Sequence, residues 1–161
     1  MASPTSIDIK EVIFIGSAKA DLAALPAEVR TEANAALWNL QNGSWPPTER
    51  YKDFSGNDKL AGVGEIRLNH DKDTYRVYNV VSYKEVLYVL EAGIKKSVRG
   101  GAIPQQDMRR LEKRYKAARD DYKANQSVYQ ASYLERERRR KAYDTAMQDG
   151  LRPASRKPKG T

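Results

Sequence analysis

The chain has 161 residues, of which 40% are hydrophobic and 31% charged, which suits one domain of ordinary size with a single core. It has no cysteine, which excludes disulfides and thiolate metal sites, and its apolar runs fall far below the roughly 20 residues that span a bilayer. The N-terminus lacks a basic segment followed by an apolar one, so we expect no signal peptide, a cytoplasmic location and no membrane partner.

Positive charge is concentrated in the last third of the chain. The formal net charge is +8, and the segment from Arg109 to the end holds 16 Lys and Arg against 7 Asp and Glu. Such a segment attracts polyanions, of which nucleic acid is the usual one. The alternative is a solvated helix whose charge serves only solubility.

The first third predicts one strand and two helices. Residues 7–15 are rich in Ile, Val and Phe, as in a strand. Ser17 is a suitable N-cap for a short helix over 18–24, and Pro26 suits the first turn of a second helix. Gly43 and the Trp-Pro-Pro sequence after it end that helix. Its apolar face is expected to comprise Val29, Ala33, Leu37 and Leu40.

The middle of the chain predicts a meander of strands. Residues 48–59 form a polar loop, and strands over 64–68 and 74–81 form a hairpin across the Asn- and Asp-rich turn at 69–73. Residues 86–92 are strongly apolar and should lie inside the sheet. Two helices grouped before a meander indicate an α+β fold rather than a doubly wound parallel sheet.

A long helix follows Pro104. Residues 105–147 contain neither Gly nor Pro and are rich in helix-forming residues. The first half should pack on the sheet, whereas beyond Tyr122 the helix should outrun a small domain. Its tyrosines would then face a partner protein, a second copy or RNA bases, unless the helix folds back or frays. Residues 150–161 are expected to be disordered. The apolar stripe of the helix comprises Met108, Leu111, Tyr115, Ala118, Tyr122, Tyr129 and Tyr133.

Several kinds of site can be set aside from the sequence. The single histidine, His70, lies in a charged turn, which disfavours a His-pair metal site and a Ser-His-Asp triad. There is no P-loop, and Gly62-Val63-Gly64 is not a dinucleotide fingerprint because no predicted strand precedes it and no predicted helix follows. We therefore expect neither a metal nor a cofactor.

What remains is a group of cations on the predicted sheet and at its exit. Arg67 and Arg76 lie on the two strands of the hairpin, and Lys95 and Lys96 follow the last strand. If these four share one concave face, they could hold a phosphate group and stabilise charge that develops at phosphorus. Alternatively, such side chains simply face solvent. The neighbouring candidates for RNA contact are Tyr75, Tyr78, Ser97 and Arg99.

These segments resemble a known family. The stretch from Phe14 to about Lys116 is similar to the phage-derived, HigB-like branch of the RelE/ParE toxin superfamily. The resemblance is carried by KADLAALPAEVRTEANAALWNLQNGSWPP, by GVGEIRLNHDKDTYRVYNVV with its Glu-Ile-Arg and Tyr-Arg-Val, and by VLYVLEAGIKKS. It implies two N-terminal helices packed on a curved, antiparallel-rich, four-stranded sheet, followed here by the long helix. The expected divisions are a toxin domain over 1–116, a charged helical extension over 117–149 and a basic tail over 150–161.

The resemblance also implies a function. Members are toxins of toxin–antitoxin systems that arrest growth by metal-independent cleavage of mRNA, commonly on the ribosome, through attack of a ribose 2′-oxygen on the adjacent phosphorus. Transferred to this chain, Arg76 stabilises the phosphate charge, Lys95 or Lys96 binds phosphate or transfers a proton, and Arg67 positions RNA. Implied partners are mRNA, the ribosome and an antitoxin of helix-turn-helix type, with an oligomer through the C-terminal helix as a further possibility.

The sequence departs from the family pattern on the last strand. Glu91 and Gly93 stand where the family usually has histidine and phenylalanine. An acidic residue near an RNA phosphate is unfavourable unless it pairs with a cation or acts as the base. Two other functions therefore remain: a toxin-fold module without cleavage activity that binds nucleic acid or protein through its basic helix, and a ParE-like inhibitor of a topoisomerase.

Overall fold

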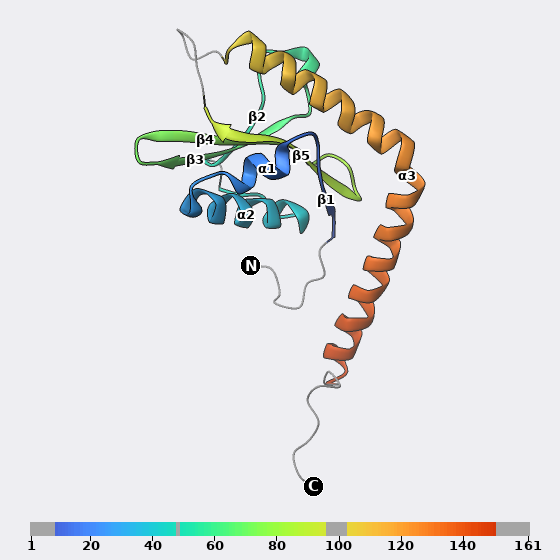
Figure 1. The fold of residues 1–161 in the computed structure, drawn as a ribbon. Helices are drawn as coiled ribbons and strands as arrows, with labels where there is room; N and C mark the ends of the chain where they lie inside the picture. Colours follow the sequence, from blue (N-terminus) through green and yellow to red (C-terminus); the bar gives the residue numbers. More distant parts are fainter. Residues whose placement is uncertain (1–8, 48, 96–102, 151–161) are drawn as a thin grey trace.

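The computed structural model describes residues 9–47, 49–95 and 103–150. Its elements are β1 (Glu11–Phe14), α1 (Ala18–Ala23), α2 (Ala27–Gln41), β2 (Tyr51–Asp53), a 3-10 turn η1 (Asp58–Leu60), β3 (Gly64–His70), β4 (Asp73–Val80), β5 (Val86–Ile94) and α3 (Gln105–Gln148). Figure 1 shows α1 and α2 below the sheet, whereas α3 crosses above it and then turns down along its side. Among the described residues, no helix is both long and apolar enough to cross a membrane.

The α+β class and the long C-terminal helix are confirmed, but the predicted strand count is wrong. The sheet has five strands in the order β1-β5-β4-β3-β2. The additional strand, β2, lies in the segment predicted as a polar loop; three residues paired with β3 are too few to show an alternating pattern. The sheet is also mixed, because β1 pairs parallel to β5 while the other pairs are antiparallel.

The β3–β4 hairpin forms where the turn residues predicted it. A two-residue loop joins the strands, and both of its residues, Asp71 (φ 46°) and Lys72 (φ 69°), have positive φ. Positive φ at both positions matches the right-handed twist of the flanking strands, as in a type I′ turn. The hairpin fixes the register of β3 against β4 and therefore decides which side chains share a face.

The core lies on both faces of the sheet. On one face, α1 and α2 pack against β3, β4 and β5, and the whole predicted apolar face of α2 is buried. On the other face, the first half of α3 packs on the sheet through Leu111, Tyr115 and Ala118, as expected. Each face thus contributes one hydrophobic cluster, and the sheet separates them.

Two glycines around the start of β3 bring other elements close to the backbone. Gly62 has φ +99°, and a Cβ there would lie 2.5 Å from the Tyr115 hydroxyl, which donates a hydrogen bond to the Ala61 carbonyl at 2.7 Å. A Cβ at Gly64 would overlap the ring of Tyr51. The Gly62-Val63-Gly64 sequence therefore serves the packing of α3 and β2 on this corner.

α3 contacts the rest of the protein along more of its length than the sequence predicted. Tyr122 and Tyr129 pack against the α3-side cluster rather than facing a partner. The Tyr122 ring stacks on Tyr83, with ring centroids 4.0 Å apart. Arg136 donates to the Ile9 carbonyl at 3.2 Å and to the Glu85 carbonyl at 3.2 Å. Within the described parts of the chain, Arg136 is the last residue of α3 that bonds another element.

Candidate functional site

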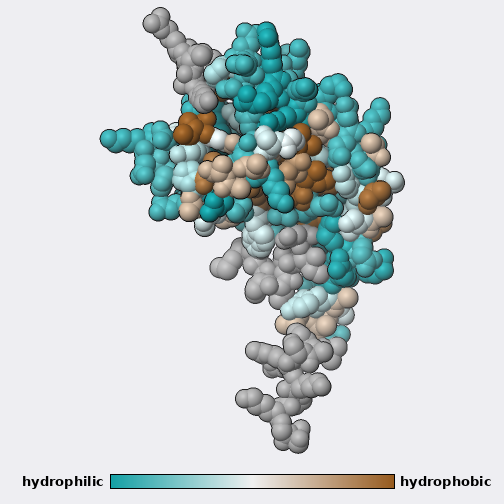
Figure 2. Space-filling view, in the orientation of Figure 1, coloured by the Kyte–Doolittle hydropathy of each residue, from teal (hydrophilic) through white to brown (hydrophobic). Residues whose placement is uncertain are grey.

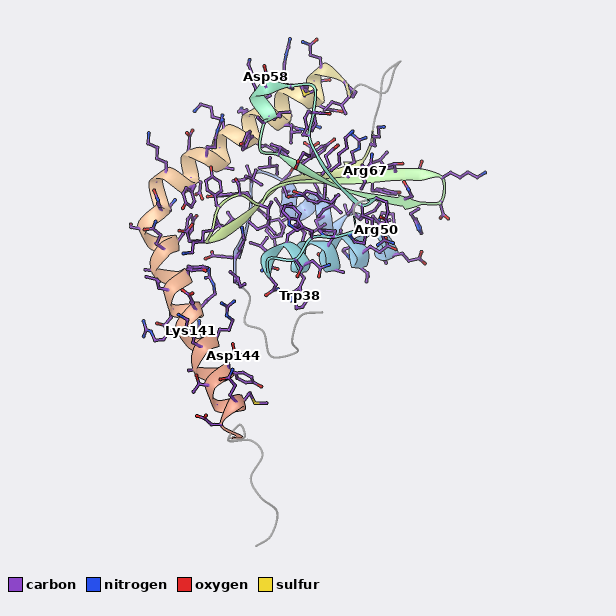
Figure 3. All side chains as sticks on the ribbon, turned by 180° about the vertical axis from the view of Figure 1, so that it is seen from behind. Trp38, Arg50, Asp58, Arg67, Lys141 and Asp144 are labelled. Carbon is purple, nitrogen blue, oxygen red and sulfur yellow. The ribbon has the colours of Figure 1, made fainter. Side chains whose placement is uncertain are left out.

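The two predicted arginines face each other across the hairpin. Arg67 on β3 and Arg76 on β4 are direct cross-strand partners, and Glu65 and Tyr78 form the next pair on the same face. Directly opposed residues of an antiparallel pair project to the same side. That side faces α3, since Tyr78 belongs to the cluster that α3 covers. In Figure 3, Arg67 lies toward the start of α3, whereas Arg50 lies toward α2.

Lys95 meets Arg76 at a small pocket on this face. The pocket has a cavity volume of about 30 Å³, room for about two water molecules. Its position follows from the register, because Gly93 lies directly opposite Arg76 and contributes no side chain. A Cβ at Gly93 would meet no described atom within 4 Å. We call it the sheet pocket; its lining comprises Arg76, Tyr78, Glu91, Gly93, Ile94, Lys95, Ile103, Asp107 and Leu111.

A larger groove adjoins the sheet pocket. Its cavity volume is about 420 Å³, within the range of small-ligand sites. The groove and the pocket share Glu91, Gly93, Ile94 and Asp107. From α3 the groove also receives Arg110 and Arg114. The candidate site thus combines a groove large enough for a nucleotide with a narrow pocket lined by two cations.

Arg76 is held in place by a buried acid. Its Nη1 atom lies 2.8 Å from Glu65 Oε1, and their side chains are 12% and 5% exposed. The contact is an ion pair without hydrogen-bond geometry, because Glu65 Oε1 has no hydrogen-bond partner. The buried Nε atoms of Arg67 and Arg76 also have no partner among the described residues. Burial raises the pKa of the Tyr78 hydroxyl, and a hydrogen bond from Arg76 opposes that shift.

The acidic departure on β5 is paired with α3. Arg110 donates to Glu91 from Nε at 2.7 Å and from Nη2 at 3.2 Å, and Arg114 Nη1 lies 3.5 Å from the same carboxylate. The bond to Glu91 raises the pKa of Arg110 above its already high value, so this arginine keeps its charge. Arg114 also donates to the Leu90 carbonyl at 2.9 Å and to Ser17 Oγ at 2.7 Å. Glu91 is therefore neutralised within the protein.

The structure brings together only some of the residues singled out in the sequence. Arg67, Arg76, Tyr78 and Lys95 share one face, as expected. Tyr75 projects to the opposite face, where it is 7% exposed in the cluster under α2, so it offers no ring to RNA there. Lys96, Ser97 and Arg99 lie outside the described residues.

Tyr78 contributes to the pocket wall rather than offering a free ring. It is 7% exposed, and its ring lies 6.1 Å from that of Phe54. A base could not stack on either face of so buried a ring.

Sequence reasoning missed the residues that come from α3 and the acid beneath Arg76. Glu65 could have been found, because it alternates with Arg67 on the same strand face. Asp107, Arg110 and Arg114 carried no such signal, since their part in the site depends on how the first turns of α3 dock on β5.

The chain is similar to known proteins over its first two thirds. A family model described as phage-derived protein Gp49-like matches residues 20–116. Among solved structures, the chain is similar to the toxin–antitoxin complex RelBE2 from Mycobacterium tuberculosis, with 20% sequence identity and a TM-score of 0.39 over 55% of this chain and 99% of that chain. That similarity is too low to assign a function. A search of curated proteins gave no match.

Proposed function

This chain belongs to the family of phage-derived Gp49-like proteins, and from that premise we propose that it is the toxin of a type II toxin–antitoxin system. The family match agrees with the resemblance to the phage-derived branch of the RelE/ParE superfamily seen in the sequence. Within the proposal, the protein is an endoribonuclease that acts on mRNA at the ribosome in the cytoplasm. An antitoxin of helix-turn-helix type would neutralise it.

One observation supports cleavage above the others. Arg67 and Arg76 are direct cross-strand partners, and Lys95 lines the same small pocket as Arg76. Two cations, Arg76 and Lys95, therefore line a space that fits a phosphate oxygen, and Arg67 lies beside Arg76 on the same face of the sheet. The adjoining groove, with its volume of about 420 Å³, has room for the nucleoside on one side of that phosphate.

The proposed reaction is an internal transesterification. The ribose 2′-oxygen attacks the adjacent phosphorus as its proton leaves, and the bond to the 5′-oxygen breaks as that oxygen gains a proton. Arg76 would stabilise the negative charge on the phosphorane oxygens, and Lys95 would bind the phosphate or supply the proton. Arg67, one strand further out, would hold the RNA backbone in line.

The acids near the site are each paired with an arginine. Glu65 is paired with Arg76 and keeps its guanidinium in a fixed position. In the groove, Arg110 pairs with Glu91 and Asp107, and Arg114 pairs with Glu91 and Asp21, so two arginines serve three carboxylates. An anion is therefore attracted chiefly at the sheet pocket, where Lys95 forms no ion pair among the described residues.

The test is expression of the chain followed by primer-extension mapping of cellular mRNA. We expect growth arrest and new RNA 5′ ends, both abolished by Lys95→Ala. A second variant, Glu65→Gln with Arg76→Ala, removes the buried pair together, because removing Arg76 alone would leave an unpaired buried charge that costs about 3–5 kcal/mol. Circular dichroism would verify that both variants fold.

Arg139→Ala is the matched control. It removes one positive charge from an exposed position on the distal half of α3, where Arg139 forms no ion pair among the described residues. We expect it to leave arrest and cleavage unchanged. New 5′ ends that persist in both site variants would refute the assignment.

A second candidate function is an RNA-binding module of the same fold that does not cleave. The pairing of Arg76 with Glu65 favours it, because part of the positive charge at the pocket is already compensated. Arrest without new RNA ends, together with retained RNA binding, would support this candidate. Stalled DNA replication without mRNA loss would instead indicate action on a topoisomerase.

A further inference from the structure

The basic residues of α3 fall into two groups that do different things. Inward-facing arginines bind other elements: Arg110 and Arg114 pair with Glu91, and Arg136 bonds the backbone at Ile9 and Glu85. Arginine suits this role because its planar fork makes several fixed hydrogen bonds at once. These residues account for the attachment of the helix and leave its other face unexplained.

The opposite side of α3 carries a row of cations, interrupted between Lys123 and Arg138, which we call the outer stripe. Arg109, Lys113, Lys116 and Lys123 follow at steps of four, three and seven, so they share one side of the helix. Figure 3 shows nitrogen-tipped side chains projecting from the outer side of α3, away from the sheet. All members are exposed, and together they comprise Arg109, Lys113, Lys116, Lys123, Arg138 and Lys141.

The first part of the outer stripe is poorly neutralised within the protein. Among the described residues, Arg109, Lys113 and Lys123 form no ion pair, and Lys116 pairs only with Asp120 on the same helix, at 2.8 Å. Further along, Arg138 pairs with Glu135 at 3.0 Å and Lys141 with Glu137 at 4.0 Å. The hydrogen bond from Lys116 lowers the pKa of Asp120, and the charges of Lys116, Arg119 and Lys123 lower it further. The potential along this part of the helix is therefore positive despite that acid.

The composition of the outer stripe points to a polyanion rather than to a membrane or an apolar partner. A helix that lies on a membrane needs an apolar face beside its cations. The apolar side of the first half of α3 is packed on the sheet, and the exposed apolar residues further along, Val128, Leu134 and Met147, are scattered rather than gathered into one face. Figure 2 shows a predominantly hydrophilic surface where α3 crosses the sheet. From Arg109 to Lys141 the stripe extends about 48 Å at about 1.5 Å per residue.

The outer stripe and the sheet pocket lie on different sides of the first turns of α3. Asp107 and Leu111, two residues on either side of Arg109, line the sheet pocket, so Arg109 projects away from it. What favours a polyanion is the charge of the stripe, because Arg109, Lys113 and Lys123 are exposed and form no ion pair among the described residues.

We propose that the outer stripe of α3 is a docking track for the phosphate backbone of RNA, separate from the residues that carry the chemistry. The choice of RNA rests on the proposed function; the existence of the track does not. The stripe would supply affinity that depends on salt, whereas the sheet pocket would act on one phosphate. Each lysine that contacts a phosphate releases counterions, so binding should weaken steeply as salt is added.

The test measures binding of the full chain to a fluorescein-labelled, single-stranded 30-nucleotide RNA in which every ribose is 2′-O-methylated. Because the attacking 2′-hydroxyl is blocked, binding is measured without cleavage. The test variant carries Lys113→Ala, Lys116→Ala and Lys123→Ala. Alanine is the best helix former, so α3 should be retained.

The control variant carries Lys19→Ala, Lys52→Ala and Lys59→Ala. These lysines are also exposed but lie off α3, so the control loses the same charge. Fluorescence anisotropy is read from 50 to 300 mM KCl. We expect the stripe variant to lose about ten- to a hundredfold in affinity near 0.1 M salt and its salt slope to fall by about 2, as for three lost phosphate contacts. The control should stay within about twofold of the unmodified chain.

Equal losses in both variants would overturn the proposal, because net charge alone would then explain binding. Competition by poly-glutamate as effective as that by the RNA would overturn it as well, by indicating an acidic protein partner. The outcome is independent of cleavage. If the unmodified chain binds through the stripe yet fails the primer-extension test, the proposed nuclease falls and the track remains.

Discussion

One carboxylate between two tyrosines contributes to the attachment of the second half of α3. Asp121 accepts hydrogen bonds from the Tyr88 hydroxyl at 2.8 Å and from the Tyr129 hydroxyl at 2.6 Å. The Tyr88 side chain is fully buried in the sheet. Burial raises the pKa of Tyr88, and the bond to Asp121 raises it further, so the hydroxyl remains a donor at physiological pH. Tyr88→Phe would remove this donor while keeping the ring.

The magnitude follows from the charge on the acceptor. A hydrogen bond to an ionised group contributes about 1.5–3 kcal/mol, more than a neutral one. Asp121 keeps its hydrogen bonds from Tyr129 and Asn125, so we expect Tyr88→Phe to lower the free energy of unfolding by about 2 kcal/mol. For a chain of this size that loss corresponds to a fall in Tm of about 4–8 °C.

Scanning calorimetry of the full chain would measure this fall. Tyr143→Phe serves as the control, because Tyr143 lies on the same helix and its hydroxyl has no bond among the described residues. The control should melt within about one degree of the unmodified chain. A Tyr88→Phe variant with an unchanged Tm would refute the view that Asp121 anchors the helix.

Three further predictions concern the core, alkaline pH and the floor of the sheet pocket. Leu111 is 1% exposed between α3 and the sheet, so Leu111→Ala should cost about 2–5 kcal/mol in urea unfolding; a loss below about 1 kcal/mol would show that the helix is loosely packed. Burial raises the pKa of Tyr122 and of Tyr129 from 10.0 to about 12, and a hydrogen bond to Glu85 (for Tyr122) or to Asp121 (for Tyr129) adds to this shift. These two hydroxyls contribute fully to the free energy of unfolding below pH 10, and the contribution is lost as pH rises through about 12. Tyr122→Phe should therefore make the decrease of the unfolding free energy between pH 10 and 12 shallower; an unchanged pH dependence would contradict this assignment. Gly93→Ala should stabilise the strand by about 0.5–1 kcal/mol, because its Cβ would meet no described atom within 4 Å; destabilisation would mean that the site is less open than described.

The pairing of Glu91 changes how the departure from the family pattern is interpreted. In the sequence, an acid next to the predicted phosphate site counted against RNA cleavage. In the structure, Arg110 and Arg114 from α3 form ion pairs with that carboxylate. The C-terminal helix therefore compensates a substitution on β5, which explains how both features can occur in one chain.

Local signals predicted most of the secondary structure. Pro26 and Gly43 bound α2, the Asp- and Asn-rich turn set the hairpin, and the absence of Gly and Pro predicted the long helix. These signals act within a few residues, where backbone sterics and turn chemistry decide the outcome. The predicted hairpin allowed Arg67 and Arg76 to share one face, and its register makes them direct cross-strand partners.

The errors have a common origin in contacts between distant segments. β2 forms because its three residues pair with β3. β1 lies parallel to β5, a strand that is distant from it in the sequence, and no local pattern in either strand specifies that pairing. Tyr75 and Tyr78 looked equivalent in the sequence, yet one is buried under α2 and the other lines the sheet pocket. The tyrosines of α3 were expected to await a partner, whereas Tyr83, Glu85 and Asp121 already engage them.

The sequence by itself determined the class of fold, the elements other than β2, the basic hairpin and the charge of the C-terminal helix, because each depends on residue type and short-range spacing. Only the tertiary structure decided which charges are free. Packing of α3 on β5 neutralises Glu91, the register of the hairpin sets Glu65 beneath Arg76, and the docking of one helix face leaves the outer stripe exposed. A charge acts on a partner only where no closer charge within the protein has already compensated it, and that depends on which distant residues the fold brings together.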